Sequence, residues 1–177
     1  MTRFQADGPA GSVVLSHATG FCTACWRPMV SQIEHSVAQI LGWDHRGHGR
    51  STGGSVPVSW WEMASDARRV ISELVPKPAP VIGVGHSMGG AVLAMVELVS
   101  PGTFDGLVLV EPILLEGPPR RRPYPLADVV RKRRRIFESR ESARANFGRK
   151  APFSCWDPIA LDGYIEEGLV ERHGQIE

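Results

Sequence analysis

Residues 81–92 read VIGVGHSMGGAV, and their pattern is the strongest indication of the fold in the sequence. Small and β-branched residues at 81–85 are typical of a buried strand, and the apolar run that continues to Val99 is typical of a buried helix, which Pro101 ends. Between them lies the pentapeptide GHSMG at 85–89, which leaves room only for a sharp turn. The stretch therefore predicts a strand, a tight turn and a helix in immediate succession.

Ser87 is the central residue of that turn, and its surroundings match the G-x-S-x-G pattern of a nucleophile elbow. We expect glycines two positions on either side because a Cβ there would collide with the neighbouring strand or helix. The turn would expose the Ser87 hydroxyl and aim the first helix amides, that of Met88 among them, at the place where an oxyanion forms. A glycine-rich turn whose serine merely caps the helix is the alternative.

Length and composition place the chain among ordinary globular proteins. Its 177 residues are 42% hydrophobic and 22% charged, with a formal net charge of +1, which fits one domain with a sizeable core. This charge gives no general electrostatic reason for a nucleic-acid or membrane partner. The N-terminal residues lack the apolar core of a signal peptide, and no stretch approaches about 18 apolar residues, so we expect a cytoplasmic location.

The order of apolar runs predicts an α/β fold, a parallel sheet flanked by helices. A helix is expected after Trp26, and a capping box at Ser59–Glu62 opens an amphipathic helix that Pro76 ends. The four expected strands lie at about residues 13–16, 38–43, 80–85 and 106–110.

The pattern changes after Glu116, so we expect a core over residues 1–116 and a helical lid over 117–177. In the lid, Leu126–Phe137 predicts a basic amphipathic helix whose apolar face, Phe137 included, lines the active site. Its arginines would form the solvated face, and an anionic partner is the alternative. A further short helix is expected from Asp157 to Gly168.

Three segments together resemble the α/β-hydrolase superfamily, and the resemblance covers about residues 12–116. They are HATGF at 17–21, WDHRGHGRS at 43–51 and the elbow at Ser87. The resemblance implies a serine hydrolase that acts on a small-molecule substrate and needs no cofactor. The fold class expected is thus an α/β-hydrolase core with a C-terminal lid.

The resemblance also implies roles for the loop that begins at His17. Either Thr19 or Phe21 would donate a second oxyanion amide beside that of Met88. His17 itself and His86, next to the nucleophile, are expected to line the substrate.

A catalytic triad needs an acid and a histidine in addition to the serine. Glu111 follows the strand at 106–110, where parallel sheets place their ligands, so we expect it to be the acid; a solvated loop residue is the alternative. His173 is the only later histidine, but no apolar strand precedes it, and we expect it to lie on the surface. The sheet would then be incomplete, with an apolar edge near Val108, and these residues alone would be inactive and marginally stable.

Two further side-chain patterns suggest other chemistry. Cys22 and Cys25 form a C-x-x-C pattern between a strand and a helix, as in thiol redox proteins. His45 and His48 lie on a glycine loop without a nearby cysteine, and we expect no metal there.

The sequence thus predicts a serine hydrolase of an ester or similarly activated carbonyl in a small, largely apolar substrate. A non-catalytic fragment or scaffold of the same fold and a thiol redox protein are the alternatives.

Overall fold

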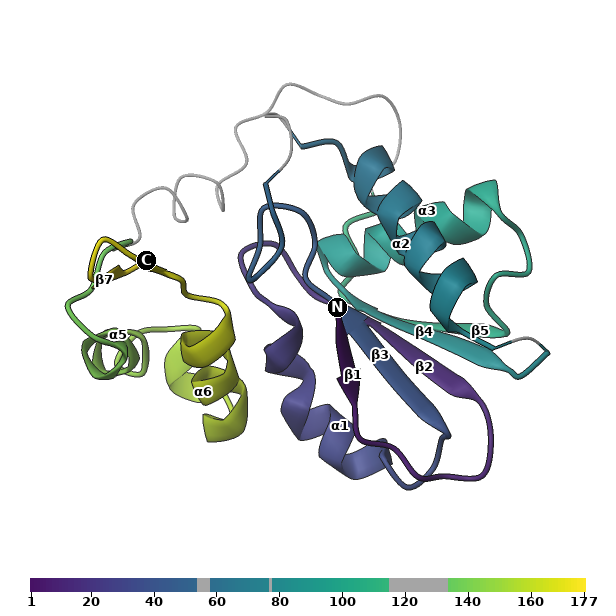
Figure 1. Ribbon diagram of the computed structural model, residues 1–177, viewed down its shortest axis with the longest axis horizontal. Coiled ribbons are helices and arrows are strands. Elements are labelled where there is room, and N and C mark those ends of the chain that lie inside the picture. Colours follow the sequence, from purple (N-terminus) through teal and green to yellow (C-terminus); the bar gives the residue numbers. More distant parts are fainter. Residues whose placement is uncertain (54–57, 77, 115–133) are drawn as a thin grey trace.

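The computed structural model describes residues 1–53, 58–76, 78–114 and 134–177 (Figure 1). A five-stranded sheet with helices on both faces forms the larger part, and a smaller helical part lies to one side of it. The elements of the larger part are β1 (Thr2–Phe4), β2 (Ser12–Ser16), η1 (Thr23–Trp26), α1 (Arg27–Ile33), β3 (Gln39–Trp43), α2 (Trp60–Leu74), β4 (Val81–His86), α3 (Met88–Val99) and β5 (Gly106–Val110).

The strand order in the sheet is β1-β3-β2-β4-β5. The four expected strands are β2 to β5, and all of their pairings are parallel, which confirms the α/β prediction. Sequence analysis missed β1, a three-residue strand that pairs antiparallel with β3, with Arg3 opposite Leu41. Its alternation of a few mixed residues is too short to give a periodic signal.

Two clusters of buried side chains cover the two faces of the sheet. On one face, Val14 of β2 packs in a cluster with Ile71 of α2 and Val92 of α3. On the other, Leu15 of β2 packs in a cluster with Val30 of α1. Alternate residues of one strand therefore enter opposite clusters, and the apolar character of all three residues at 13–15 follows from burial on both sides.

Helix α2 begins as the sequence predicts. The Ser59 hydroxyl accepts a hydrogen bond from the Trp61 amide at 3.2 Å, and a Glu62 carboxylate oxygen accepts one from the Ser59 amide, also at 3.2 Å. The capping box at Ser59–Glu62 is thereby confirmed. The helix ends at Leu74, shortly before Pro76.

Strand β5 lies at one edge of the sheet and pairs with β4 alone among the described strands. Its side chains Val108 and Val110 are 51% and 44% exposed. The expected apolar edge near Val108 is present in the described part of the chain.

The C-terminal part, called the cap below, consists of residues 134–177. It contains α5 (Arg140–Phe147), η2 (Phe153–Cys155), α6 (Pro158–Glu167) and the two-residue strands β6 (Glu171–Arg172) and β7 (Gln175–Ile176). Helix α6 confirms the helix expected from Asp157, whose carboxylate accepts a hydrogen bond from the Ile159 amide at 2.7 Å. Sequence analysis did not anticipate α5 or the β6–β7 hairpin.

The predicted basic helix over 126–137 needs correction. Residues 126–133 lie outside the described residues, and residues 134–136 are not helical. Phe137 forms a β-bridge with Ile176 of the hairpin and is buried beside Phe147 of α5, with ring centroids 5.4 Å apart. Its large side chain is apolar because it fills the interior of the cap.

The cap packs against the larger part at η1. Cys22 and Ala24 are buried in the same apolar cluster as Leu161 and Tyr164 of α6. Gly163 of α6 lies so close to η1 that a Cβ would come within 2.8 Å of the Ala24 carbonyl oxygen. No helix in the described ranges has the length and apolarity needed to cross a bilayer.

Candidate active site

Ser87 occupies the turn between β4 and α3 in a strained backbone conformation. Its φ and ψ are 53° and −117°, outside the regions that residues with a Cβ ordinarily adopt. Backbone hydrogen bonds hold it there: the Ser87 amide donates to the Val110 carbonyl at 2.9 Å, and the Ile113 amide donates to the Ser87 carbonyl at 3.2 Å. The neighbouring strand and the loop after it therefore stabilise the turn.

The glycines around Ser87 are required by close backbone approach, as the sequence predicts. A Cβ on Gly89 would lie 2.1 Å from the Ser16 carbonyl oxygen, and one on Gly85 would lie 2.7 Å from the Gly90 Cα. These distances are far below a van der Waals contact. The start of α3 can approach the ends of β2 and β4 only because these side chains are absent.

The amides at the N-terminus of α3 are available to a ligand. Met88 is the first residue of the helix, and the Ser87 side chain makes no capping hydrogen bond to it. The first amides of a helix lack partners within it and carry partial positive charge. The geometry is compatible with the predicted oxyanion role of the Met88 amide.

The loop after β2 offers a second amide. The Phe21 amide donates to the Ala18 carbonyl at 3.2 Å, closing a turn in which Gly20 has a φ of 75°. The Phe21 amide is thus engaged within the loop, whereas Thr19 lies at the exposed tip of the turn. Of the two predicted donors, this favours Thr19.

His17 is 2% exposed, and both of its ring nitrogens have partners. Nδ1 lies 2.9 Å from the Ala18 carbonyl oxygen, and Nε2 accepts a hydrogen bond from the His45 amide at 3.0 Å. These contacts fix the neutral ring with the proton on Nδ1. Burial lowers the pKa of His17 from 6.5 to about 4.

His45 continues this buried network. Its Nε2 lies 2.9 Å from the Ser16 hydroxyl, and its ring packs edge-on to His17 at 4.7 Å. Its Nδ1 is buried and has no hydrogen-bond partner among the described residues. Burial, and then the neighbouring His17 and His48, lower the pKa of His45. His48 packs against His17 at 5.2 Å. These histidines support the loop behind the elbow, and no group of three or more potential metal ligands occurs within the described residues.

Asp44 ties the loop after β3 to η1. Its carboxylate accepts hydrogen bonds from the Thr23 amide at 2.7 Å and the Arg50 amide at 3.0 Å. Burial alone would raise the pKa of Asp44, but the hydrogen bonds from these two amides outweigh it, and the pKa is lowered. The segment at 43–51, which the resemblance singled out, thus braces the start of η1, which follows the loop at 17–21.

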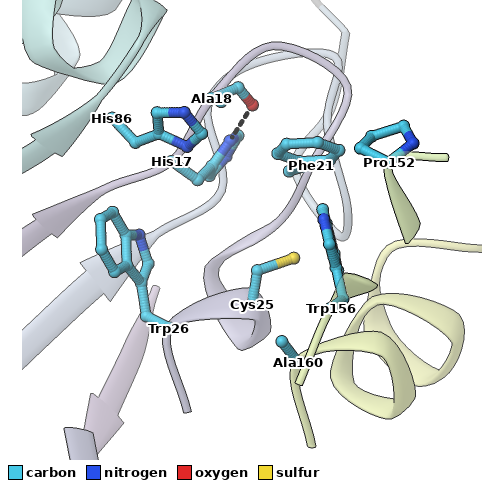
Figure 2. A pocket seen from close by; sticks show the side chains of 9 residues that line it. All are labelled: His17, Ala18, Phe21, Cys25, Trp26, His86, Pro152, Trp156 and Ala160. Carbon is cyan, nitrogen blue, oxygen red and sulfur yellow. Dashed lines mark hydrogen bonds between the residues drawn. The ribbon is translucent and has the colours of Figure 1, made fainter. Parts of the chain in front are cut away.

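A cavity of about 330 Å³ lies between the larger part and the cap (Figure 2). Phe21 and Trp156 face each other across the two parts, with ring centroids 4.7 Å apart in an edge-to-face arrangement. Ser87 is not among the lining residues, although the adjacent His86 is. The lining residues are His17, Ala18, Phe21, Cys25, Trp26, His86, Pro152, Trp156 and Ala160.

His17 and His86 line this cavity, and their role toward a substrate stays a prediction, whereas the expectation for Phe137 needs correction. Phe137 lies in the interior of the cap and is 1% exposed, so it does not line the cavity. Trp156 is the aromatic residue of the cap that lines the cavity. It immediately precedes the Asp157–Pro158 helix start, and that local signal could have identified it as a packed residue.

Glu111 lies beside Ser87 in the sheet register. His86 of β4 is paired with Val110 of β5, and Ser87 and Glu111 are the residues that directly follow the ends of these two strands. Glu111 is exposed and also has a positive φ, of 42°. Its assignment as the triad acid stays a prediction.

His173 lies at the tip of the β6–β7 hairpin, exposed, with a φ of 51°. It is followed by Gly174 with a φ of 74°, the conformation of a tight two-residue hairpin turn. The hairpin lies on the far side of the cap from β4 and α3 (Figure 1). Within the described residues, no hydrogen bond joins the Ser87 hydroxyl to a histidine.

Comparison with known proteins connects this geometry to a family. A model described as serine aminopeptidase, S33, matches residues 7–176. Human monoglyceride lipase is 30% identical over 113 residues, 62% of this chain and 37% of the lipase. The type I acyl-CoA thioesterase mpaH from Penicillium roqueforti is 29% identical over 179 residues, 90% of this chain and 40% of the thioesterase.

A solved structure gives the same result for the fold. The peroxisomal α/β-hydrolase Lpx1 from Saccharomyces cerevisiae superposes with a TM-score of 0.77 at 19% identity, covering 96% of this chain and 52% of that chain. The chain matches 37% and 40% of the lengths of the two curated relatives named above. From the match over 7–176 and the shared fold, the chain belongs to the serine aminopeptidase S33 family of α/β-hydrolases.

Proposed function

We propose that this protein is a serine hydrolase that cleaves an ester or similarly activated carbonyl, such as a thioester, in a small and largely apolar substrate. The observation that carries the proposal is the strained backbone of Ser87, with a φ of 53°, at the N-terminus of a helix whose first amides are available. Such strain persists only where the surrounding structure enforces it, and it concentrates at functional sites. A serine that merely capped α3 would accept a hydrogen bond from one of the first helix amides, and the Ser87 side chain accepts none from the described helix.

In the proposed reaction the Ser87 hydroxyl oxygen attacks the carbonyl carbon of the substrate. The carbonyl oxygen becomes an oxyanion, which the amides of Met88 and Thr19 would hold. The bond to the leaving group then breaks, and water releases the acyl group from Ser87. The serine proton would pass to a histidine that Glu111 orients, and from that histidine to the leaving group. Within the described residues, no hydrogen bond joins Ser87 to a histidine.

The cavity supports an apolar substrate. Phe21, Trp26 and Trp156 contribute aromatic surface to its lining. Burial of apolar surface contributes about 25 cal/mol per Å², so an acyl chain is the part of a substrate that such a lining would favour. The names of the relatives, a monoglyceride lipase and an acyl-CoA thioesterase, are consistent with ester and thioester substrates.

The proposal can be tested by identifying the residue that a fluorophosphonate probe modifies. We expect the phosphonate on Ser87, located by mass spectrometry of peptides, and no labelling of Ser87→Ala. Ser72→Ala, at an exposed serine on α2, is the matched control and should label as the unsubstituted chain does. Identification of the site does not require turnover.

Two outcomes would contradict the proposal. Labelling spread over several serines at similar rates would mean that the elbow does not activate Ser87. Complete absence of label on folded protein would favour the non-catalytic scaffold of the same fold.

A further inference from the structure

We infer that Cys22 and Cys25 form a reactive thiol pair in the wall of the cavity, which small-molecule disulfides oxidise to an intramolecular disulfide. Both cysteines are free, and their sulfur atoms lie 4.0 Å apart. The pair is separate from Ser87 and its oxyanion amides. The inference therefore does not depend on the proposed hydrolase activity.

The backbone between the two cysteines already has the closure that a disulfide needs. The Cys25 amide donates to the Cys22 carbonyl at 3.2 Å, which closes one tight turn at the start of η1. Such a turn brings its first and last Cα atoms within about 7 Å, and disulfides span Cα separations of about 4.4–6.8 Å. The sulfurs, which lie 4.0 Å apart, have to approach by about 2 Å to reach the S–S bond length of about 2.05 Å.

The two thiols differ in access, which sets the order of events. Cys25 lines the cavity, where a small molecule can reach its sulfur (Figure 2). Cys22 is 0% exposed, and its thiol donates to the Gly163 carbonyl of α6 at 3.8 Å. Cys25 is therefore the attacking thiol, and Cys22 is the resolving thiol.

The ionisation of the two thiols agrees with this order. The hydrogen bond with Cys22 lowers the pKa of Cys25 despite its burial. The same hydrogen bond and then burial raise the pKa of Cys22. The thiolate is the nucleophilic form, so the group that faces the cavity is also the one that ionises more readily.

The chemistry balances with a small-molecule disulfide as the oxidant. The Cys25 thiolate attacks one sulfur of the disulfide, whose S–S bond breaks and releases one small thiolate. The Cys22 sulfur then attacks Cys25 in the mixed disulfide, the second small thiolate leaves, and the Cys22 proton ends on a released thiol. Two protein thiols are oxidised, and one disulfide is reduced to two thiols.

Oxidation would alter the contact between the cavity and the cap. The disulfide removes the S–H donor that Cys22 offers to Gly163, and it draws the Cys25 sulfur from the cavity wall toward Cys22. Since there is no room for even a methyl group between Gly163 and Ala24, a small displacement of η1 would alter the contact between α6 and η1. We therefore expect the packing of α6 on η1 to change with the oxidation state of the two cysteines.

The test uses Cys155→Ser, which removes the exposed third cysteine. This chain is treated with oxidised glutathione, quenched with acid, alkylated and analysed by mass spectrometry. We expect loss of two hydrogens, a linked Cys22–Cys25 peptide, and full reversal by a reductant. With Cys22→Ser added, the reaction should stop at a glutathione adduct on Cys25.

Cys25→Ser added to Cys155→Ser provides the matched control. It should react at least about tenfold more slowly than the Cys22→Ser version, because the remaining Cys22 thiol is buried. The difference should disappear in denaturant, where both thiols are exposed, and circular dichroism checks that each variant is folded. A persistent glutathione adduct on the Cys155→Ser chain, or equal rates for the two single-thiol chains while folded, would overturn the inference.

Discussion

Acidification from about pH 7 to about pH 5 should destabilise this protein because His17 is buried in its neutral form. In the folded state its pKa is about 4, whereas an unperturbed histidine has a value of 6.5. The unfolded state therefore binds the proton more readily. The stabilisation is fully present above about pH 6.5 and is lost as the pH falls toward about 4.

The size of the effect follows from the two pKa values. One pKa unit corresponds to about 1.4 kcal/mol, so the fall from 6.5 to about 4 corresponds to about 3 kcal/mol at full protonation of both states. At about pH 5 the loss relative to pH 7 is about 2 kcal/mol. Burial lowers the pKa of His45 as well, so its contribution has the same sign. A domain with a total stability of about 5–15 kcal/mol would lose a measurable fraction.

The assay is urea unfolding followed by circular dichroism at the two pH values. His17→Gln cannot titrate, so its stability should change less between pH 7 and pH 5, by about 2 kcal/mol, than that of the unsubstituted chain. His173→Gln is the matched control, because His173 is exposed, and it should keep the full pH dependence. The comparison uses only the change in unfolding free energy between the two pH values, so a loss of stability in His17→Gln that is equal at both pH values does not affect it.

A direct titration of the His17 ring by NMR gives a second measurement. A pKa near 6.5 in the folded chain, or an unchanged pH dependence in folded His17→Gln, would refute the reasoning. Either result would mean that burial and the hydrogen bond from the His45 amide do not keep the ring in its neutral form.

Four other substitutions have definite expected outcomes. Gly89→Ala should destabilise the fold by more than about 3 kcal/mol in urea unfolding, because its Cβ would lie 2.1 Å from a backbone oxygen. Gly53→Ala is the control, because a Cβ at Gly53 would meet no atom of the described residues within 4 Å. Similar losses for the two variants would contradict the close approach at Gly89. Glu111→Gln should slow fluorophosphonate labelling by more than about tenfold if Glu111 is the triad acid, with the unfolding midpoint unchanged; a change under about fivefold would point to another acid. His173→Ala should alter neither labelling nor stability, and a loss of labelling would identify it as the base. Asp44→Asn should cost about 1–3 kcal/mol in unfolding free energy, because Thr23 and one other amide donate to the carboxylate; an unchanged midpoint would show that the brace contributes nothing.

Much of the sheet could be predicted because its determinants are local. Residues 13–15 are all apolar because the strand is buried on both faces, and the elbow glycines follow from the tight turn that they form. The capping box at Ser59–Glu62 is likewise complete within four residues. Such signals need no knowledge of the rest of the chain.

The parts that were missed depend on contacts between distant segments. Phe137 was assigned to a cavity wall because its spacing fits a helix, but its environment is set by Ile176 at the other end of the cap. The neutral state of His17 depends on an amide of His45, which lies on a different loop. Neither partner can be chosen from sequence spacing, because loop closure and not periodicity brings them together.

The close seating of α6 on η1 limits how a substrate can reach the cavity. Arg27 forms ion pairs with Glu166 and Glu167 of α6, beside the contact of Gly163 with Ala24. A rigid rotation of the cap away from the larger part would therefore displace η1 and, with it, the loop that carries Thr19. We expect access to the cavity instead through small movements at Pro152 and Trp156, which line it from the cap, so that the loop that carries Thr19 keeps its position.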